Sequence, residues 1–313
     1  MYAVSDTTRA ADPGLSGPQA NASDIPPVQV CLFGGLTLLK MGEPVGSRAG
    51  PKAEALLLSL ALEENRGVCR ERLLSQVWPE SEPSLAVQSL HSLLHSLHRL
   101  LGDAIGGATP VVHTAEIYRI NTRAGIAVDI TAFEAFARQG DRHWHAGAWS
   151  TAGSCYSAAI TLYRGDLRAC PDDSAVVERE RLRALYLVML GRLADIARRD
   201  HDYSSALEYA SLVLKYDAGR EDAHRTLMHC YAVLGQRVQA MRQYLLCERL
   251  LRATFDAVPE PATQELYDRL RLHPGGVLEE SDSSSTPTGG LQAFFSSSAA
   301  GYAIPMNRQP QLL

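Results

Sequence analysis

The spacing of hydrophobic positions changes along the chain, from short stretches that alternate to long stretches with the spacing of helices. Near the start, Val28 to Phe33 alternates, and Gly34-Gly35 provides a turn before a second such stretch. Helical spacing begins at Pro51, and proline suits the first turn of a helix. The pattern predicts, in order, strands over residues 28–33 and 36–40, helices over 51–64, 70–78 and 84–101, a hairpin of 111–114 and 117–121, and a strand over 126–129.

This order of strands, three helices and a closing hairpin is typical of a helix-turn-helix with a wing. In such a domain the second helix of the turn lies in the DNA major groove, and the hairpin contacts the backbone beside it. The predicted recognition helix is 84–101 and the predicted wing is 111–121. Because many small α+β domains share this pattern, it does not by itself identify a DNA-binding protein.

Beyond residue 130 almost all of the spacing is helical, and a repeat of 34 residues is visible. Residues 193–197 return as 227–231, and Ala206 returns as Ala240. A 34-residue period is the signature of tetratricopeptide repeats, and alanine at a crossing lets paired helices approach closely. Another helix pair is predicted over 133–162 and a long helix over 174–199. The predicted fold is thus an α+β winged helix-turn-helix followed by an all-α tetratricopeptide-like domain, a stack that typically binds proteins or peptides.

Composition divides the chain into four parts. Residues 1–27 and the Ser/Gly-rich residues 274–313 carry no periodicity and are expected to be disordered. Between them lie the predicted winged-helix domain, 28–130, and the predicted helical domain, 131–273. Their junction is short and apolar, so we expect two separately cored units in one rigid body. Three aromatic residues of the tail suit either a short docking motif or an incidental placement: Phe294, Phe295 and Tyr302.

The overall composition favours a protein of the cytoplasm. The formal net charge of −5 gives no global basic field that would point to nucleic acid or an anionic membrane. No apolar run reaches the roughly 20 residues of a membrane-spanning helix, and no secretory signal is visible at the start. The six cysteines are scattered without a C-x-x-C pair, which indicates reduced thiols. We therefore expect a cytoplasmic location and no membrane partner.

Sequence motifs of enzymes are missing. Residues 46–52 superficially resemble a phosphate-binding loop, but Pro51 and Ala53 stand where that loop needs a glycine and a hydroxyl. Neither G-x-S-x-G nor H-E-x-x-H occurs. We expect a protein that is not an enzyme, with no catalytic residue, no metal and no cofactor.

The order of these segments resembles the bacterial transcriptional activator domain (BTAD) proteins, which include the Streptomyces antibiotic regulatory proteins (SARPs). The resemblance spans roughly residues 28–271 and rests on the order of several short matches. The matching stretches are 28–39, 48–57, 72–79, 97–102, 128–133, 162–167 and 258–267. The resemblance implies an OmpR-type winged helix that binds double-stranded promoter DNA. It also implies that the repeats serve dimerisation, signal input, or contact with RNA polymerase or another regulator.

The predicted recognition helix departs from that family because it carries little positive charge. Members usually have several Arg or Lys residues there, whereas Arg99 is the one Arg or Lys of this helix. Residues 28–130 contain nine Lys and Arg against ten Asp and Glu, and cationic side chains supply most of the non-specific affinity for DNA. Two functions therefore stay open: a DNA-binding regulator, or a non-enzymatic adaptor whose degenerate winged helix is only structural.

Candidate DNA contacts follow from helical geometry. Four side chains point most nearly away from the leucine face of the predicted recognition helix, where they would contact bases or phosphates. They are Gln88, Ser92, His95 and Arg99. In the wing, Arg119 and Arg123 are either phosphate contacts or ordinary charges at a strand edge.

Three histidines on the same helix also form a stripe. His91, His95 and His98 are spaced i, i+4, i+7. This spacing suits DNA contacts or solvated polar side chains. It also suits a metal site held by a pair of histidines, although the sequence does not indicate a third ligand for it. If His95 and His98 contact DNA, their protonation adds charge that the helix lacks. The affinity for DNA is then expected to rise as the pH falls from 8 to 6.

Overall fold

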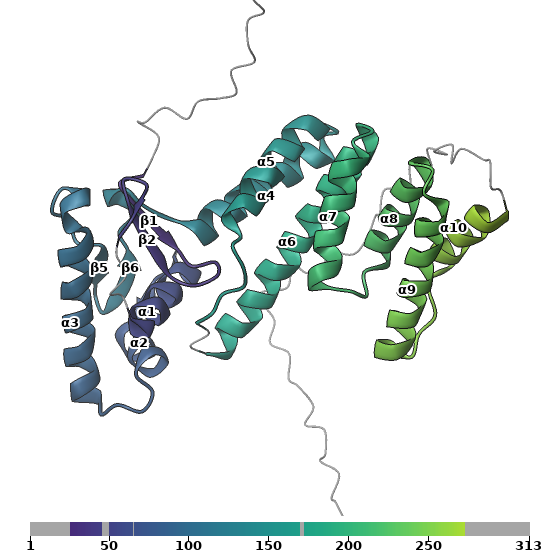
Figure 1. The fold of residues 1–313 in the computed structure, drawn as a ribbon. Coiled ribbons are helices and arrows are strands. Elements are labelled where there is room, and N and C mark those ends of the chain that lie inside the picture. The colour runs from purple at the N-terminus through teal and green to yellow at the C-terminus, as the bar shows by residue number, and fades with distance from the viewer. Residues whose placement is uncertain (1–25, 46–49, 65, 170–171, 273–313) are drawn as a thin grey trace, which may run out of the picture.

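An N-terminal part of strands and helices is followed by a row of helix pairs (Figure 1). The structure is a computed structural model that describes residues 26–45, 50–64, 66–169 and 172–272. The predicted disordered lead-in up to residue 25, Arg48 and the predicted tail, with its three aromatic residues, lie outside the described residues.

The predicted strands and helices of the N-terminal part are confirmed to within a few residues. Three helices lie between the first strands and a hairpin, in the order that the hydrophobic pattern predicts. The elements are β1 (Val28–Cys31), β2 (Thr37–Lys40), β3 (Glu43–Pro44), α1 (Pro51–Leu62), β4 (Val68–Cys69), α2 (Arg70–Val77), α3 (Pro83–Leu101), the 3-10 helix η2 (Gly102–Ile105), β5 (Val111–Thr114), β6 (Ile117–Ile120), η3 (Thr122–Ala124) and β7 (Ile126–Val128).

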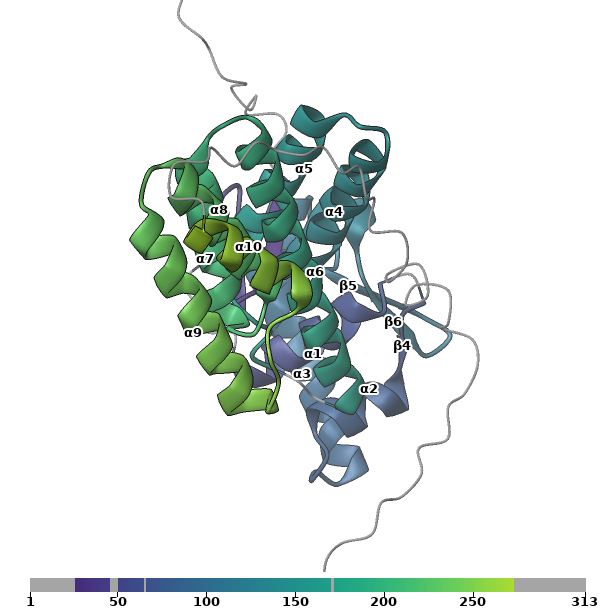
Figure 2. The same cartoon turned by 90° about the vertical axis from the view of Figure 1, so that its right-hand side faces the viewer.

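The strands form two small sheets. The first has the order β3-β2-β1-β7, in which β1 pairs antiparallel with β2 and parallel with β7. The second has the order β4-β6-β5 and is antiparallel. In this sheet β5 and β6 form the hairpin. Strand β4 pairs with β6 and leads directly into α2 (Figure 2).

The helical part is built from antiparallel neighbours, most of them joined by short turns. Its helices are α4 (Asp129–His145), α5 (Trp149–Leu162), α6 (Asp173–Arg199), α7 (Tyr203–Tyr216), α8 (Glu221–Val233), α9 (Arg237–Phe255) and α10 (Pro261–Leu272). The 34-residue repeat is confirmed, because α7 and α9 begin at Tyr203 and Arg237, 34 residues apart. Ala206 and Ala240 are both fully buried, as expected for small residues at helix crossings.

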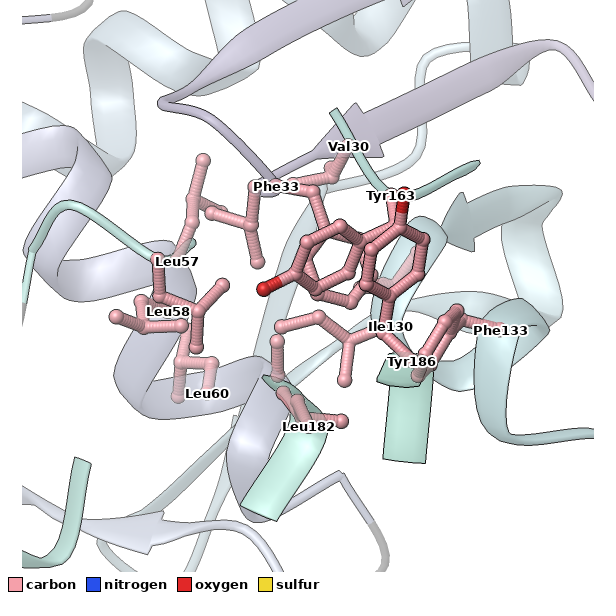
Figure 3. Packing of buried hydrophobic residues seen from close by; sticks show 14 of the residues in the cluster. Val30, Phe33, Leu57, Leu58, Leu60, Ile130, Phe133, Tyr163, Leu182 and Tyr186 are labelled. Atoms are coloured by element: carbon pink, nitrogen blue, oxygen red, sulfur yellow. The ribbon is translucent and has the colours of Figure 1, made fainter. Parts of the chain in front are cut away.

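One hydrophobic core runs through both parts, so the expectation of two separate cores is wrong. The same cluster of buried residues extends from Val28 in β1 to Leu227 in α8. At its centre the Phe33 ring lies 5.1 Å from that of Phe133 and 4.8 Å from that of Tyr163 (Figure 3). Phe33 follows β1 whereas its partners belong to the helical part, so the aromatic contacts join the two parts directly.

Backbone contacts reinforce this junction. The Asp129 carboxylate accepts hydrogen bonds from the backbone N–H groups of Leu32 (2.7 Å), Phe33 (3.0 Å) and Ile130 (2.8 Å). Gly34 has a φ of +76°, and a Cβ there would lie 2.9 Å from the carbonyl oxygen of Arg164, so glycine is required. The N-terminal sheet is therefore held against the first helix pair by a short, specific contact.

Two further expectations concern the chain as a whole. The five cysteines among the described residues are free thiols, in agreement with the prediction from their spacing. Within the described ranges, no helix is long and apolar enough to cross a membrane.

Candidate nucleic-acid interface

Helix α3 lies at one end of the molecule, at the outer edge of the N-terminal part (Figure 1). Pro83 occupies its first turn, where the missing N–H costs nothing, and the helix passes directly into a 3-10 turn at Gly102. Its inward face is formed by Ala86, Leu90, Leu97 and Leu101, all buried. The apolar spacing that predicts the helix therefore also fixes which face is left to solvent.

The outward face of α3 gathers all four predicted contact residues of this helix. Gln88, Ser92, His95 and Arg99 are exposed, and their spacing of i, i+4, i+7 and i+11 places them on one continuous row. Arg99, at the C-terminal end of this row, takes part in no ion pair among the described residues. The row offers an amide, a hydroxyl, an imidazole and one cation, a set suited to base edges and phosphates.

The two predicted wing residues belong to other elements than this row. Arg119 is on β6, half-buried, and its guanidinium donates a hydrogen bond to the carbonyl oxygen of Arg66 at 2.7 Å. Arg123 lies in η3, beyond the hairpin, where it is exposed. The structure therefore brings together the helix candidates, whereas Arg119 braces the loop before β4.

The tip of the hairpin carries a carboxylate. Ala115 and Glu116 form its two-residue turn, and both have positive φ, +48° and +68°. Such a turn matches the twist of the strands, although non-glycine residues adopt it at some cost. Glu116 pairs with Arg70 at 3.0 Å, so the cation nearest the tip is neutralised.

Most cations of the N-terminal part are already engaged. Lys40 pairs with Asp103 at 2.6 Å, Arg72 pairs with Glu63 at 3.0 Å, and Lys52 donates to the carbonyl oxygen of Val77. The exposed cations that have neither an ion pair nor a side-chain hydrogen bond in the described part of this region are Arg66, Arg99 and Arg123. Any attraction of DNA by this region thus depends on few charges.

The three histidines of α3 do not form one exposed stripe, as the sequence suggested. His91 and His95 are exposed, but His98 is half-buried, and its ring lies 3.0 Å from the place where a Cβ of residue 102 would be. His98 therefore packs over Gly102 at the end of the helix. Among the described residues, no group of three or more His, Cys, Asp or Glu side chains is placed to hold a metal.

Sequence reasoning missed two features of this surface. Leu85 is 56% exposed and lies three residues before Gln88 on the outward face. Helical spacing places it on the polar side of the helix, but it is not among the predicted contact residues. The pairing of Glu116 with Arg70 depends on the register between β4 and β6, which the sequence does not reveal.

Comparison with known proteins places the helical part in a family. The family model described as the bacterial transcriptional activator domain matches residues 128–271. The regulatory protein AfsR of Streptomyces griseus is 24% identical over 230 residues, which cover 73% of this chain and 23% of AfsR. The transcriptional regulatory protein EmbR of Mycobacterium tuberculosis is 29% identical over 269 residues, which cover 83% of this chain and 66% of EmbR.

A solved structure supports the same fold. Mycobacterium tuberculosis EmbR, solved in complex with a low-affinity phosphopeptide, matches with a TM-score of 0.66 and 22% identity. The match covers 79% of this chain and 65% of that chain, so this chain spans less than two thirds of both AfsR and EmbR. Residues 128–271 therefore match the bacterial transcriptional activator domain, and the chain is similar to the regulatory proteins AfsR and EmbR.

Proposed function

We propose that this protein is a non-enzymatic, DNA-binding transcriptional regulator of the SARP type that acts in the cytoplasm. Residues 28–130 serve as an OmpR-type winged helix, with α3 in the major groove of promoter DNA and the β5–β6 hairpin beside it. The names of the relatives support regulation of transcription. The observation that carries DNA binding is the exposed polar row of α3 at one end of the molecule.

We infer that the two ends of the row contact different parts of the DNA. The N-terminal residues of a recognition helix contact base edges. Gln88 lies in that half and its amide can form a bidentate pair with the N6 and N7 atoms of adenine. Arg99, at the other end, is suited to a backbone phosphate, whose contact strengthens binding without reading sequence.

The helical domain, 131–273, supplies contacts with other macromolecules in this proposal. Stacked helix pairs expose long surfaces that typically bind proteins or peptides. Dimerisation, or contact with RNA polymerase or another regulator, is therefore its expected role. The rigid aromatic junction at Phe33 would keep such a partner in a fixed place relative to α3.

Replacing Gln88 tests the proposed reading of sequence. Gln88→Ala should weaken binding to the cognate site in the protein's own upstream DNA by about 1–3 kcal/mol and leave binding to unrelated DNA unchanged. Gln239→Ala, which removes an exposed glutamine of α9, is the matched control and should affect neither. Fluorescence anisotropy with both DNA fragments measures the difference. Equal loss on both fragments, or no loss on either, would argue against base reading by Gln88.

A second candidate function is a non-enzymatic adaptor whose N-terminal part is structural. It is favoured by the engaged cations of this part and by the carboxylate of Glu116 at the hairpin tip. In that case the wild-type protein should bind DNA only weakly and without regard to sequence. The same anisotropy titrations distinguish the two functions.

A further inference from the structure

Leu85 is the one large apolar side chain of α3 that is exposed, although every residue of this helix is described. It is 56% exposed in the first turn, whereas Leu90, Leu97 and Leu101 are almost completely buried. Leu85 does not belong to the hydrophobic core, so it does not help to pack the fold. Because the fold does not require an apolar side chain here, a contact with another molecule would explain the leucine.

Helical spacing places Leu85 on the row that the proposed function uses. Leu85, Gln88 and Ser92 are spaced i, i+3 and i+7, so their side chains share the outward face. Residues three apart on a helix have Cβ atoms about 5–6 Å apart. Successive base pairs are about 3.4 Å apart along DNA. Leu85 and Gln88 can therefore contact bases one or two steps apart.

The chemistry of leucine limits what it can contact in DNA. It donates and accepts no hydrogen bond, so it contributes nothing to phosphates or to polar base edges. The apolar feature that the major groove presents is the C5 methyl group of thymine. This inference rests on the proposed function: we propose that Leu85 is a specificity-determining residue that packs on a thymine methyl group, one or two base pairs from the adenine contacted by Gln88.

Replacing thymine by deoxyuridine tests the assignment, because that change removes only the methyl group. Each thymine of the bound fragment is replaced in turn, and binding of the full chain is measured by anisotropy. For the wild type, one replacement should weaken binding about fourfold, the effect of exposing one methyl group. Leu85→Ala should weaken binding to the unmodified fragment by a similar factor and make binding insensitive to that replacement.

Two control variants make the result specific. Leu272→Ala removes a leucine that is 63% exposed at the end of α10 and should keep the full effect of deoxyuridine. Gln88→Ala should weaken binding but keep that effect as well. Because Leu85 is exposed, its replacement leaves the core intact, and circular dichroism checks the helix content.

The possible failures are distinct. If the wild type binds its site with sequence preference but tolerates deoxyuridine at every position, the assignment of Leu85 is overturned and the proposed function stands. The same holds if Leu85→Ala keeps the wild-type response to deoxyuridine. If the wild type shows no sequence preference at all, the proposed function is overturned, and the role of Leu85 with it.

Discussion

Asp129 shows how a single side chain joins the two parts of the molecule. It is buried at the junction of β7 and α4, where its carboxylate accepts three backbone N–H groups. Burial raises its pKa from 3.8 to about 6, although the hydrogen bonds from Phe33 and Leu32 oppose this rise. The raised pKa means that its charged form is less favourable in the folded state than in the unfolded state.

This shift predicts a pH-dependent stability. Because the folded pKa lies above the unfolded one, the contribution of Asp129 to stability is complete below pH 3.8 and is lost as the pH rises through about 6. Asp129→Asn cannot titrate and cannot accept all three hydrogen bonds. The variant should be less stable than wild type at pH 4.5, and the difference should shrink by roughly 2 kcal/mol by pH 7.5. Urea unfolding at the two pH values measures it, and a difference that stays constant would contradict the account.

Within the helical elements, close approach is set by small residues. Gly140 of α4 is buried, and a Cβ there would lie 2.4 Å from the Tyr156 ring of α5. Tyr156 is itself fully buried and donates a hydrogen bond to Asp141 at 2.9 Å, so its ring has little room to move. The glycine therefore permits the pairing of α4 with α5.

Two glycine substitutions separate packing from helix propensity. Gly140→Ala should destabilise the protein by about 1–3 kcal/mol, because overpacking outweighs the higher helix propensity of alanine. Gly191→Ala lies in α6, where nothing is within 4 Å of the added Cβ, and should stabilise by about 0.5–1 kcal/mol. Thermal unfolding of both variants gives the comparison. If both substitutions change the melting temperature in the same direction, Gly140 is not closely packed against Tyr156.

The repeat alanines lead to a parallel prediction for the later pairs. Ala206→Trp and Ala240→Trp should each destabilise the helical part by several kcal/mol, because both positions are fully buried. Ala253→Trp, at an exposed position of α9, is the matched control and should change stability little. Urea denaturation followed by circular dichroism measures all three. Wild-type stability of the two buried variants would rule out close packing at these crossings.

The elements were predictable from sequence because each depends on local spacing. The period of leucines fixes the bounds of α3, and the 34-residue repeat fixes the starts of α7 and α9. The outward position of Gln88 and Arg99 follows from the same spacing. The role of Arg119 was not predictable, because it depends on how β6 meets the loop that contains Arg66.

At the scale of the whole molecule, the continuous core was the main feature that the sequence did not reveal. The contact of Phe33 with Phe133 and Tyr163 joins residues about 100 or more positions apart, and no local sequence pattern predicts it. A short apolar junction indicated rigidity but not a shared core. This arrangement fixes α3 relative to the helical surfaces, and the proposed function would use that fixed geometry to hold a partner beside DNA.

The measurement that tests DNA binding most directly is the salt dependence of binding for Arg99→Ala. Arg99 is the exposed, unpaired cation of α3 in the described structure, and each phosphate contact contributes about one unit to the slope of log K against log salt. Wild type, Arg99→Ala and the matched control Arg249→Ala, from an exposed position of α9, are titrated with the upstream fragment and with unrelated DNA. We expect Arg99→Ala to weaken binding to both fragments and to reduce the slope by about one, with Arg249→Ala unchanged. Micromolar or weaker binding that ignores sequence, and that Arg99→Ala leaves unchanged, would contradict binding of DNA by α3 and favour the adaptor.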